Sequence, residues 1–332
     1  MTDTSCVLGV DSGGSGMRVA LGGLHGAALP APVSSKEPVR TGARGIDAEH
    51  FTEQLVPMAR ELLAQAGGGH ITAVAVGAAG MASLGDDLRA QLPGALQQAL
   101  GVRRVALAAD GVTAYVGALG DRPGAVVAAG TGMIAIGTDL AAWHRADGWG
   151  HLLGDCGGGA WIGRAGLEAA MRAFDGRRNG SKALLARAEE LFGPAPELPG
   201  QLYPRTDRPA LLASFAPEVA RCAPDDPVAD AILREAARHI AEAAAAVCPA
   251  SDAVRQGEVP EVALTGGLFK MGRALLGPVH AELRDLLRHV RVVAAGGDPL
   301  DGAVRIAVDL AADRLRLPLD PRMLTVHLPE AG

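Results

Sequence analysis

Short runs of apolar residues alternate along the chain with longer stretches in which apolar residues recur every three or four positions. The short runs predict buried β-strands, and the longer stretches predict amphipathic α-helices. The expected strands cover residues 6–10, 17–23, 71–77, 104–110, 124–130, 133–139 and 261–267. The expected helices cover residues 47–65, 111–119, 157–174, 226–247 and 299–315, with Asp47 placed to cap the first. This mixed order predicts an α/β fold. Residues 176–225, with prolines and charges, are expected to be less regular and to form a cap or an interaction surface.

Two segments share the plan of strand, glycine turn and strand: GVDSGGSGMRVALG at 9–22 and VVAAGTGMIAIG at 126–137. Glycine lets main-chain N–H groups approach a ligand closely, and a tight turn of such groups forms a concave anion site. Ser12, Ser15 and Thr131 add hydroxyl donors. Two facing turns fit the polyphosphate of a nucleotide, and ordinary hairpin turns are the alternative. The chain lacks the P-loop pattern, and the glycines after the first strand do not fit the dinucleotide-binding pattern.

Two aspartates follow predicted strands. Asp11 ends the first strand beside the first glycine turn, where a carboxylate suits Mg²⁺ held through water; an Asx-type turn is the alternative. Asp110 ends strand 104–110 and begins the next helix. Open α/β sheets place their chemistry at such strand ends, but an aspartate there also suits helix capping. These residues alone leave both pairs of alternatives open.

The segment GWGHLLGDCGGGAWIG, residues 148–163, combines Asp155 with three consecutive glycines at 157–159. Glycines destabilise a helix start, so their presence suggests either close main-chain approach to a ligand, with Gly159 among the contacts, or a flexible turn. Trp149 lies between two glycines of an aromatic-poor chain. Its indole is expected either to wall a sugar pocket or, as is commoner, to anchor the loop in the core.

Composition narrows the class of protein. The 332 residues suggest about two domains, and 48% hydrophobic residues allow a sizeable core. A net charge of −6 without a basic run argues against a nucleic-acid partner. The four cysteines, Cys6, Cys156, Cys222 and Cys248, have no zinc-type spacing. With no signal-peptide pattern and no long apolar segment, we expect a cytoplasmic protein that does not enter a membrane.

Six motifs in chain order carry a resemblance: DSGGSGMRVALGG, AVGAAGM, AADG, AAGTGM, GWGHLLGDCGGGAWIGRAGLEAAMRAFDGR and VALTGGLF. Together they resemble the BadF/BadG/BcrA/BcrD-type ATPase family of the actin, hexokinase and Hsp70 superfamily, and within it the N-acetylglucosamine and glucosamine kinases. The resemblance implies two ribonuclease-H-like domains flanking a cleft. The first would comprise residues 1–118 with a C-terminal helix at about 300–332. The second, residues 119–299, would carry sugar and adenosine motifs.

The resemblance also implies roles for single residues, with ATP and Mg²⁺ as cofactors. Asp110 would be the catalytic base. The first phosphate motif would be Asp11, Gly13, Gly14 and Ser15, with Asp11 holding Mg²⁺ through water; the second would be Gly130, Thr131 and Gly132; the adenosine motif would be Thr265, Gly266 and Gly267. The expected substrate contacts are Ala79, Gly80, Asp110, Gly130, Gly148, Trp149, Asp155 and Gly159.

The activity implied is phosphorylation of the 6-hydroxyl of an amino sugar by ATP, and we expect glucosamine as the substrate and a homodimer as the assembly. Asp147, Asp155 and Glu168 would favour the ammonium of glucosamine. Three departures affect the acetamido contact: Cys156 where such kinases have a polar residue, three glycines at 157–159 where they have Gly-Ser-Gly or a similar run, and Arg44 where they often have Asn. The alternatives are an N-acetylglucosamine kinase, an ATP sensor without enzymatic activity, and an ATPase that activates a dehydratase through an iron–sulfur cluster, which needs two cysteines per chain.

Overall fold

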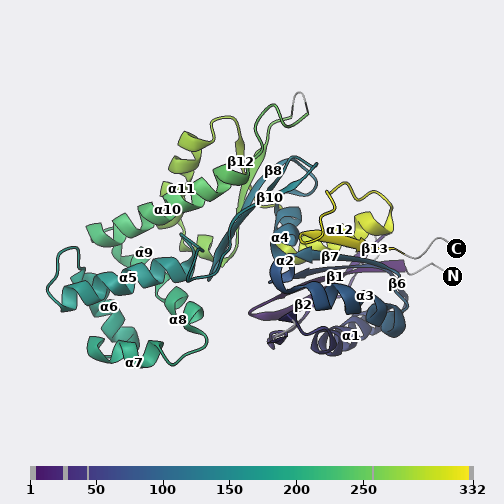
Figure 1. The fold of residues 1–332 in the computed structure, drawn as a ribbon, viewed down its shortest axis with the longest axis horizontal. Coiled ribbons are helices and arrows are strands. Elements are labelled where there is room, and N and C mark those ends of the chain that lie inside the picture. The colour runs from purple at the N-terminus through teal and green to yellow at the C-terminus, as the bar shows by residue number, and fades with distance from the viewer. Residues whose placement is uncertain (1–4, 25–28, 43–44, 256–257, 329–332) are drawn as a thin grey trace. The chain divides into compact units, whose positions relative to one another are not determined.

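The computed structural model describes residues 5–24, 29–42, 45–255 and 258–328, and its chain divides into two compact units. Unit 1 comprises Met1–Pro123, Thr138–Trp143 and Ala294–Gly332, and unit 2 comprises Gly124–Gly137 and His144–Val293. Strands and helices alternate in both units, as Figure 1 shows, so the predicted α/β class is confirmed. No helix among the described residues is both long enough and apolar enough to cross a bilayer.

Unit 1 is built on a six-stranded sheet in the order β13-β7-β6-β1-β2-β3. Its strands are β1 (Ser5–Gly13), β2 (Gly16–Gly23), β3 (Val33–Ser35), β6 (His70–Ala78), β7 (Arg104–Ala109) and β13 (Leu324–His327), with a separate pair β4 (Thr41–Gly42) and β5 (Gly45–Ile46). Its helices are α1 (Ala48–Gln65), α2 (Met81–Leu84), α3 (Asp86–Leu100), α4 (Asp110–Leu119) and α12 (Pro299–Ala311). Strands β1, β6 and β7 run parallel, whereas β1 and β2 form the predicted antiparallel hairpin.

The helices of unit 1 cover both faces of its sheet: α1 and α3 lie on one face, and α4 and α12 on the other (Figure 1). Asp47 caps α1 as expected, because its side chain accepts a hydrogen bond from the N–H of His50. Helix α12 packs so closely that a Cβ added at Gly9 or Gly22 would collide with Val304. Strand β13 then pairs antiparallel with β7. Helix α12 and strand β13, late in the chain, therefore complete the sheet that β1 begins and its helical cover.

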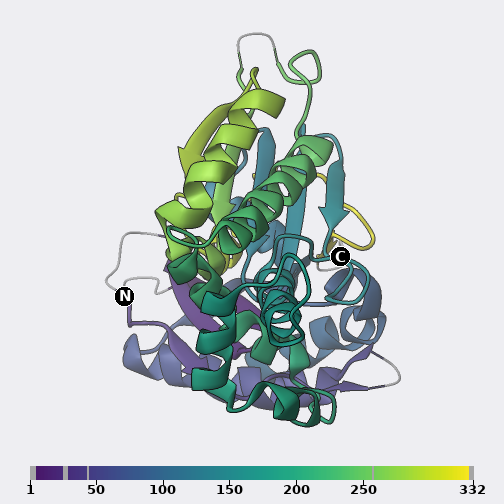
Figure 2. The same cartoon turned by 90° about the vertical axis from the view of Figure 1, so that its left-hand side faces the viewer.

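Unit 2 contains a five-stranded sheet in the order β10-β9-β8-β11-β12. Its strands are β8 (Gly124–Ala129), β9 (Met133–Thr138), β10 (Trp143–Asp147), β11 (Glu261–Thr265) and β12 (Arg291–Ala294). Its helices are α5 (Gly159–Phe174), α6 (Lys182–Phe192), α7 (Leu198–Leu202), α8 (Arg208–Ser214), α9 (Ala216–Cys222), α10 (Pro227–Val247) and α11 (Arg273–Leu286), with 3₁₀ turns at Ala195–Glu197 and Gly267–Met271. Helices α10 and α11 lie side by side over one face of this sheet (Figure 2).

The order of strands repeats between the two sheets. Reading β3-β2-β1-β6-β7 against β10-β9-β8-β11-β12, each sheet places three consecutive strands beside strands that return from later in the chain. In both, the first strand of the unit pairs in parallel with the next returning strand, β1 with β6 and β8 with β11. The repeated plan inferred from the two glycine hairpins is therefore confirmed.

Residues 176–225 differ from the expectation of an irregular segment. Four helices, α6 to α9, form there, and α6, α8 and α9 pack on α5. The prolines lie in the first turn of α7, α8 and α9, where their missing N–H has no helical partner to lose. The prolines therefore begin helices here and do not interrupt them.

Candidate functional site

Three predicted site segments of unit 1 meet at one edge of its sheet. In the parallel register Ser12 lies opposite Ala78, and Ala78 lies opposite Ala109. The residues at and after the ends of these strands therefore emerge together: Gly13 and Gly14 at the end of β1, Ala79 and Gly80 after β6, and Asp110 after β7. The N–H of Ala79 donates to the carbonyl of Ser12 at 2.8 Å, which joins the first two segments directly. This is the carboxyl edge, where open α/β sheets bind their ligands.

The first glycine turn leaves open space in front of its main chain. A Cβ added at Gly13 or Gly14 would have no heavy atom within 4 Å, and neither glycine has a positive φ. Gly16 is different, because its φ is +121° and an added Cβ would collide with the carbonyl of Ser35. Surface glycines such as Gly94 share the openness of Gly13. Gly13 differs from such glycines because it lies at the edge of the sheet, where other predicted site segments converge, and there the open space can hold a ligand.

Asp11 is paired with Arg18, its partner across the hairpin. The Nη2 and Nε atoms of Arg18 donate to Oδ2 of Asp11 at 2.6 and 3.0 Å. Through Nη1 the same guanidinium donates to Asp298 at 2.6 Å. Asp298 caps α12, and although burial raises its pKa, the hydrogen bonds from Arg18 and from the main chain hold that pKa below its ordinary value. Neither Arg18 nor Asp298 was predicted as part of the site. The ion pair between them joins positions 280 residues apart, and such a pair leaves no local pattern in the sequence.

Asp110 is the first residue of α4, and Ala109 occupies the capping position. The half-buried carboxylate accepts a hydrogen bond from the N–H of Gly111 at 3.0 Å. The side chain therefore lies at the edge of the sheet in the first turn of a helix, where partly unsatisfied N–H groups favour a negative charge. Capping in its usual form, from the residue before the helix, does not explain an aspartate at this position.

A pocket of about 310 Å³ adjoins this edge. Its lining is Ser12, Gly13, Gly14, Pro38, Val39, Thr41, Ile46, Ala78, Ala79 and Gly80. The volume is at the small end of the range for small-molecule sites. Gly13 and Gly14 of the predicted first phosphate motif thus share one cavity with the predicted substrate contacts Ala79 and Gly80, whereas Asp11, Ser15 and Asp110 are not among its lining residues. The lining residues Pro38, Val39, Thr41 and Ile46 were not predicted. Arg44, which was expected to affect the acetamido contact, lies outside the described residues.

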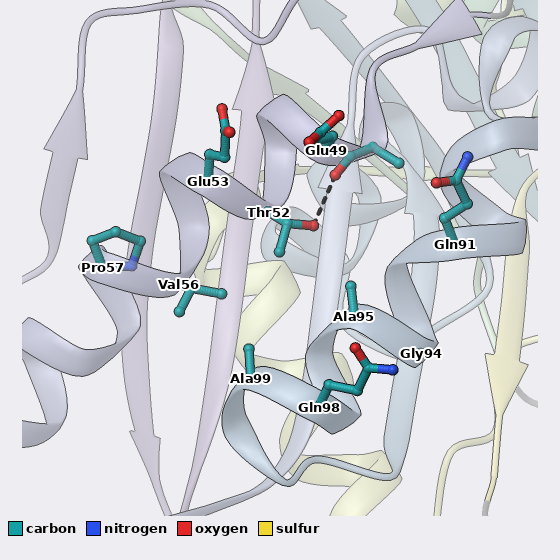
Figure 3. Close-up of a pocket in the computed structure, with 11 residues that line it drawn as sticks. Glu49, Thr52, Glu53, Val56, Pro57, Gln91, Gly94, Ala95, Gln98 and Ala99 are labelled. Atoms are coloured by element: carbon teal, nitrogen blue, oxygen red, sulfur yellow. Dashed lines mark hydrogen bonds between the residues drawn. The ribbon is translucent and has the colours of Figure 1, made fainter.

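A larger groove of about 770 Å³ lies between α1 and α3. Figure 3 shows Glu49, Thr52 and Glu53 on α1 facing Gln91 and Gln98 on α3. The Thr52 hydroxyl is occupied, because it donates to the carbonyl of Ala48 at 2.7 Å. None of the predicted site residues lines this groove. Its size alone therefore does not make it the candidate site.

In unit 2 the second glycine turn is supported by the start of α5. The N–H groups of Gly159 and Ala160 donate to the carbonyls of Gly130 and Thr131 at 2.9 and 2.8 Å. A Cβ added at Gly158 would lie 2.7 Å from the carbonyl carbon of Gly132, and one at Gly159 would lie 2.6 Å from the carbonyl oxygen of Gly130. These two glycines of the run therefore allow main-chain packing on the turn, and the predicted flexible turn is not needed to explain them.

The predicted adenosine motif lies beside the second turn. Thr265, at the end of β11, is opposite Ala128 of β8. Gly266 has a φ of +105°, and a Cβ there would collide with the carbonyl of Ala129, whereas one at Gly267 would meet nothing within 4 Å. Gly130 is equally open. The carboxyl edge of the second sheet thus brings the two predicted motifs of unit 2 together, with an open glycine in each.

The loop that carries Asp155 is fastened by Asp147. The two carboxylate oxygens of Asp147 accept hydrogen bonds from the N–H groups of Asp155 and Cys156 at 2.6 and 2.9 Å. The Asp155 carboxylate accepts from the N–H of Gly150 at 3.0 Å and packs against Gly132 of the second turn. Burial raises the pKa of Asp155, its neighbour Asp147 adds to that rise, and the Gly150 hydrogen bond opposes it.

Two expectations for this loop need correction. Glu168 was grouped with Asp147 and Asp155, but its carboxylate pairs with Arg172 one turn along α5. Trp149 was expected more often as a core anchor, yet 64% of its surface is exposed. Its ring lies under the guanidinium of Arg145, 4.3 Å from ring centroid to Cζ. A stacked cation supports an exposed indole without burial, so the core-anchor interpretation is wrong.

Among the described residues, no group of three or more His, Cys, Asp and Glu side chains is arranged to hold a metal ion. Cys6 is buried in unit 1, and Cys156, Cys222 and Cys248 are half-buried in unit 2. Burial raises the pKa of each of these thiols, to about 11 for Cys248, so they are protonated at neutral pH.

The repeated strand order and the glycine hairpin at each carboxyl edge define the fold of the actin, hexokinase and Hsp70 superfamily. The model of the BadF/BadG/BcrA/BcrD ATPase family matches residues 8–284, and the chain belongs to this family.

Two solved structures show how far the likeness extends. A protein from Chromobacterium violaceum, provisionally named an N-acetylglucosamine kinase, is 30% identical with a TM-score of 0.69, and the match covers 90% of this chain and 97% of that one. A ROK-family glucokinase from Streptomyces griseus, solved with glucose and AMPPNP, is 20% identical with a TM-score of 0.54. The match covers 93% of this chain and 99% of that one, and the likeness is one of fold alone.

A curated relative is similar over a short stretch. The N-acetylmuramic acid/N-acetylglucosamine kinase of Clostridium acetobutylicum is 39% identical over 77 residues, which is 23% of this chain and 24% of that protein. The match therefore spans about a quarter of the relative.

Proposed function

We propose that the protein is an ATP-dependent amino-sugar kinase that transfers a phosphoryl group to the 6-hydroxyl of the sugar. The observation that carries this proposal is the juxtaposition in unit 1 of Asp110, the open first glycine turn and the pocket beside Ala79 and Gly80. A base, an anion cradle and a small cavity are the parts that phosphoryl transfer to a sugar alcohol requires. Membership of an ATPase family supports ATP as the donor.

The open glycines support the nucleotide side of the proposal. Gly13, Gly14, Gly130 and Gly267 have neither a positive φ nor a neighbour that a Cβ would meet. All four belong to motifs that the resemblance assigns to phosphate or adenosine. Main-chain N–H groups without side chains in front of them suit an anion that must come close.

In the reaction we propose, Asp110 accepts the proton of the 6-hydroxyl while that oxygen forms a bond to the γ-phosphorus of ATP. The bond from this phosphorus to the bridging oxygen breaks, and its electron pair leaves with ADP. The N–H groups of the first glycine turn, which lies at the same sheet edge as Asp110, stabilise the charge on the transferred group. Positioning and electrostatics supply most of the acceleration in such transfers.

The residues present fit a hydrated Mg²⁺ better than a directly bound ion. Both hydrogen bonds that Asp11 accepts from Arg18 end on Oδ2, and Oδ1 of the same carboxylate can accept from a water of the ion. Mg²⁺ keeps several waters when phosphates supply its other ligands. When bound, the ion would neutralise charge on the phosphates, and Asp11 would orient one of its waters.

Glucosamine remains the substrate predicted from the sequence, and the carboxylates that favour it are now fewer. Asp147 is engaged with the main chain and Glu168 with Arg172, so recognition of an ammonium would depend on Asp155. N-acetylglucosamine is the second candidate, because the names of the Chromobacterium and Clostridium relatives favour it.

A coupled ADP-release assay across hexoses, glucosamine, N-acetylglucosamine and N-acetylmuramic acid tests the proposal. We expect sugar-dependent ADP release, and a product whose phosphorus couples to the two C6 protons in NMR spectra. The ratio of kcat/KM for glucosamine and N-acetylglucosamine decides between the two candidates. ADP release that no sugar stimulates would reject the kinase and favour an ATPase or an ATP sensor.

A further inference from the structure

His50 is a buried histidine with a place in the fold but no part in the reaction proposed above. It lies in the first turn of α1 with 6% of its surface exposed. Buried histidines must direct both ring nitrogens to partners, since an unpaired polar atom in the interior is costly. The partners of this ring therefore show what it holds.

Both partners that His50 reaches outside its own helix belong to one extended segment. Its Nδ1 accepts a hydrogen bond from the N–H of Arg40 at 3.1 Å, and its Nε2 lies 3.3 Å from Oε1 of Glu37. The carbonyl of Arg40 accepts from the N–H of Asp47 at 2.9 Å. The peptide groups on both sides of Arg40 are thus fastened to the start of α1.

The fastened segment is one wall of the 310 Å³ pocket. Pro38 and Val39 lie between the two points that His50 contacts, and Thr41 follows directly; all three line the cavity. The facing wall is made of main chain at the ends of β1 and β6. Because that wall is held by the sheet, the width of the pocket depends on what fixes residues 38–41.

We propose that His50 is a positioning residue that sets the affinity for the sugar by fixing this wall through the amide of Arg40. The proposal rests on the proposed function, because it takes the pocket as the place of the sugar. An Nδ1 that accepts requires a neutral ring with its proton on Nε2, which lies 3.3 Å from both Oε1 of Glu37 and the side-chain nitrogen of Gln54. Arg40 is an exposed residue, and its half-buried hydrogen bond joins the segment to the buried ring, so the loss of that bond leaves the amide to water and frees the wall.

Three variants separate positioning from folding. In His50→Asn the side-chain oxygen can replace Nδ1 as an acceptor, whereas in His50→Gln the amide reaches the position of Nε2. We expect His50→Gln to raise KM for the sugar about five- to tenfold, as the loss of one hydrogen bond implies. His50→Asn should stay near the wild type, and kcat and KM for ATP should stay near the wild type in both. Glu37→Gln is the matched control, with little change expected because the Glu37 side chain is 62% exposed.

A second readout needs neither ATP nor sugar. Hydrogen exchange of the Arg40 amide should be protected in the wild type and in His50→Asn, and about tenfold faster in His50→Gln. Equal exchange in the wild type and His50→Gln would show that His50 does not hold the Arg40 amide. Faster exchange with an unchanged KM for the sugar would overturn its role in affinity. If the wild type phosphorylates no sugar, the proposed function fails, and the role of His50 in sugar affinity fails with it. The exchange data still decide whether His50 holds the Arg40 amide.

Discussion

The two glycine turns occupy equivalent places in sheets of the same strand order, yet they are supported by different means. The first turn has side-chain support, because Arg18 joins Asp11 on β1 to Asp298 at the start of α12. The second turn has main-chain support, because the first N–H groups of α5 bond to its carbonyls and glycines let the helix approach. One plan thus tolerates two supports, provided that the main chain of each turn remains open on its free side.

The largest difference between the two edges is chemical. Strand β7 is followed by Asp110, whereas β12, its counterpart in the second sheet, is followed by Ala295 and Gly296. Asp110→Asn should lower kcat by about 10²–10⁴-fold, because a general base is lost, and should retain ATP binding. Steady-state kinetics with titration of a fluorescent nucleotide measure both. Asp285→Asn, on the exposed face of α11, is the control, and a loss smaller than tenfold at Asp110 would contradict the base role.

The main-chain support of the second turn predicts a stability effect. Gly158→Ala would place a methyl group against the carbonyl of Gly132, and overpacking of this kind costs about 1–3 kcal/mol. Urea unfolding measures the change. Gly277→Ala is the matched control, since its Cβ would meet nothing within 4 Å and alanine should stabilise α11 by about 0.4–1 kcal/mol. Similar unfolding midpoints for the two variants would remove the distinction between packed and open glycines.

The open side of the second turn predicts the opposite pattern. Gly130→Ala should leave unfolding almost unchanged, because its Cβ has free space. The methyl group should nevertheless obstruct an anion and reduce kcat/KM for ATP about tenfold, or about 1.4 kcal/mol. Thermal unfolding and initial rates on the same preparation separate the two effects. Full activity in this variant would mean that the turn does not face the phosphates.

The smallest expected effect concerns the side-chain support of the first turn. Arg18→Gln breaks two ion pairs whose partners are partly exposed, so the loss of stability should be about 1 kcal/mol or less. The pKa of Asp298 is lowered in the folded state, so its contribution is present above the unfolded pKa and is lost as pH falls through the folded pKa. Stability of the variant should therefore fall less steeply with acid than that of the wild type, as urea unfolding across acidic pH would measure.

Local patterns predicted most of the fold. The apolar runs located β1, β6, β7, β8 and β11, and the Asp47 cap was found where expected. The helices within 176–225 were missed because proline was taken as a breaker, although at the first turn it is tolerated. The effect of proline on a helix depends on its position within that helix, and the sequence alone did not locate the helix starts.

The sequence predicted the residues of the candidate site, but not the side-chain contacts that hold them in place. The carboxyl-edge residues Asp11, Gly13, Ala79 and Asp110 came from motifs that the sequence displays. The pairing of Arg18 with Asp298 joins residues 280 positions apart, and the exposure of Trp149 depends on a stacked Arg145. The first contact is set by tertiary packing and the second by the shape of a loop, and neither follows from the period of apolar residues.

The layer that α12 and β13 complete has a consequence for synthesis on the ribosome. The residues of unit 2 have all emerged once Val293 has left the ribosome, whereas the first sheet lacks one covering helix and an edge strand until residues 299–327 emerge. Val304 fills space beside Gly9 and Gly22 that would otherwise stand empty. The unit whose synthesis begins first is therefore finished last, and a chain that has emerged only as far as residue 298 has all of its second unit but a first sheet with one face partly uncovered.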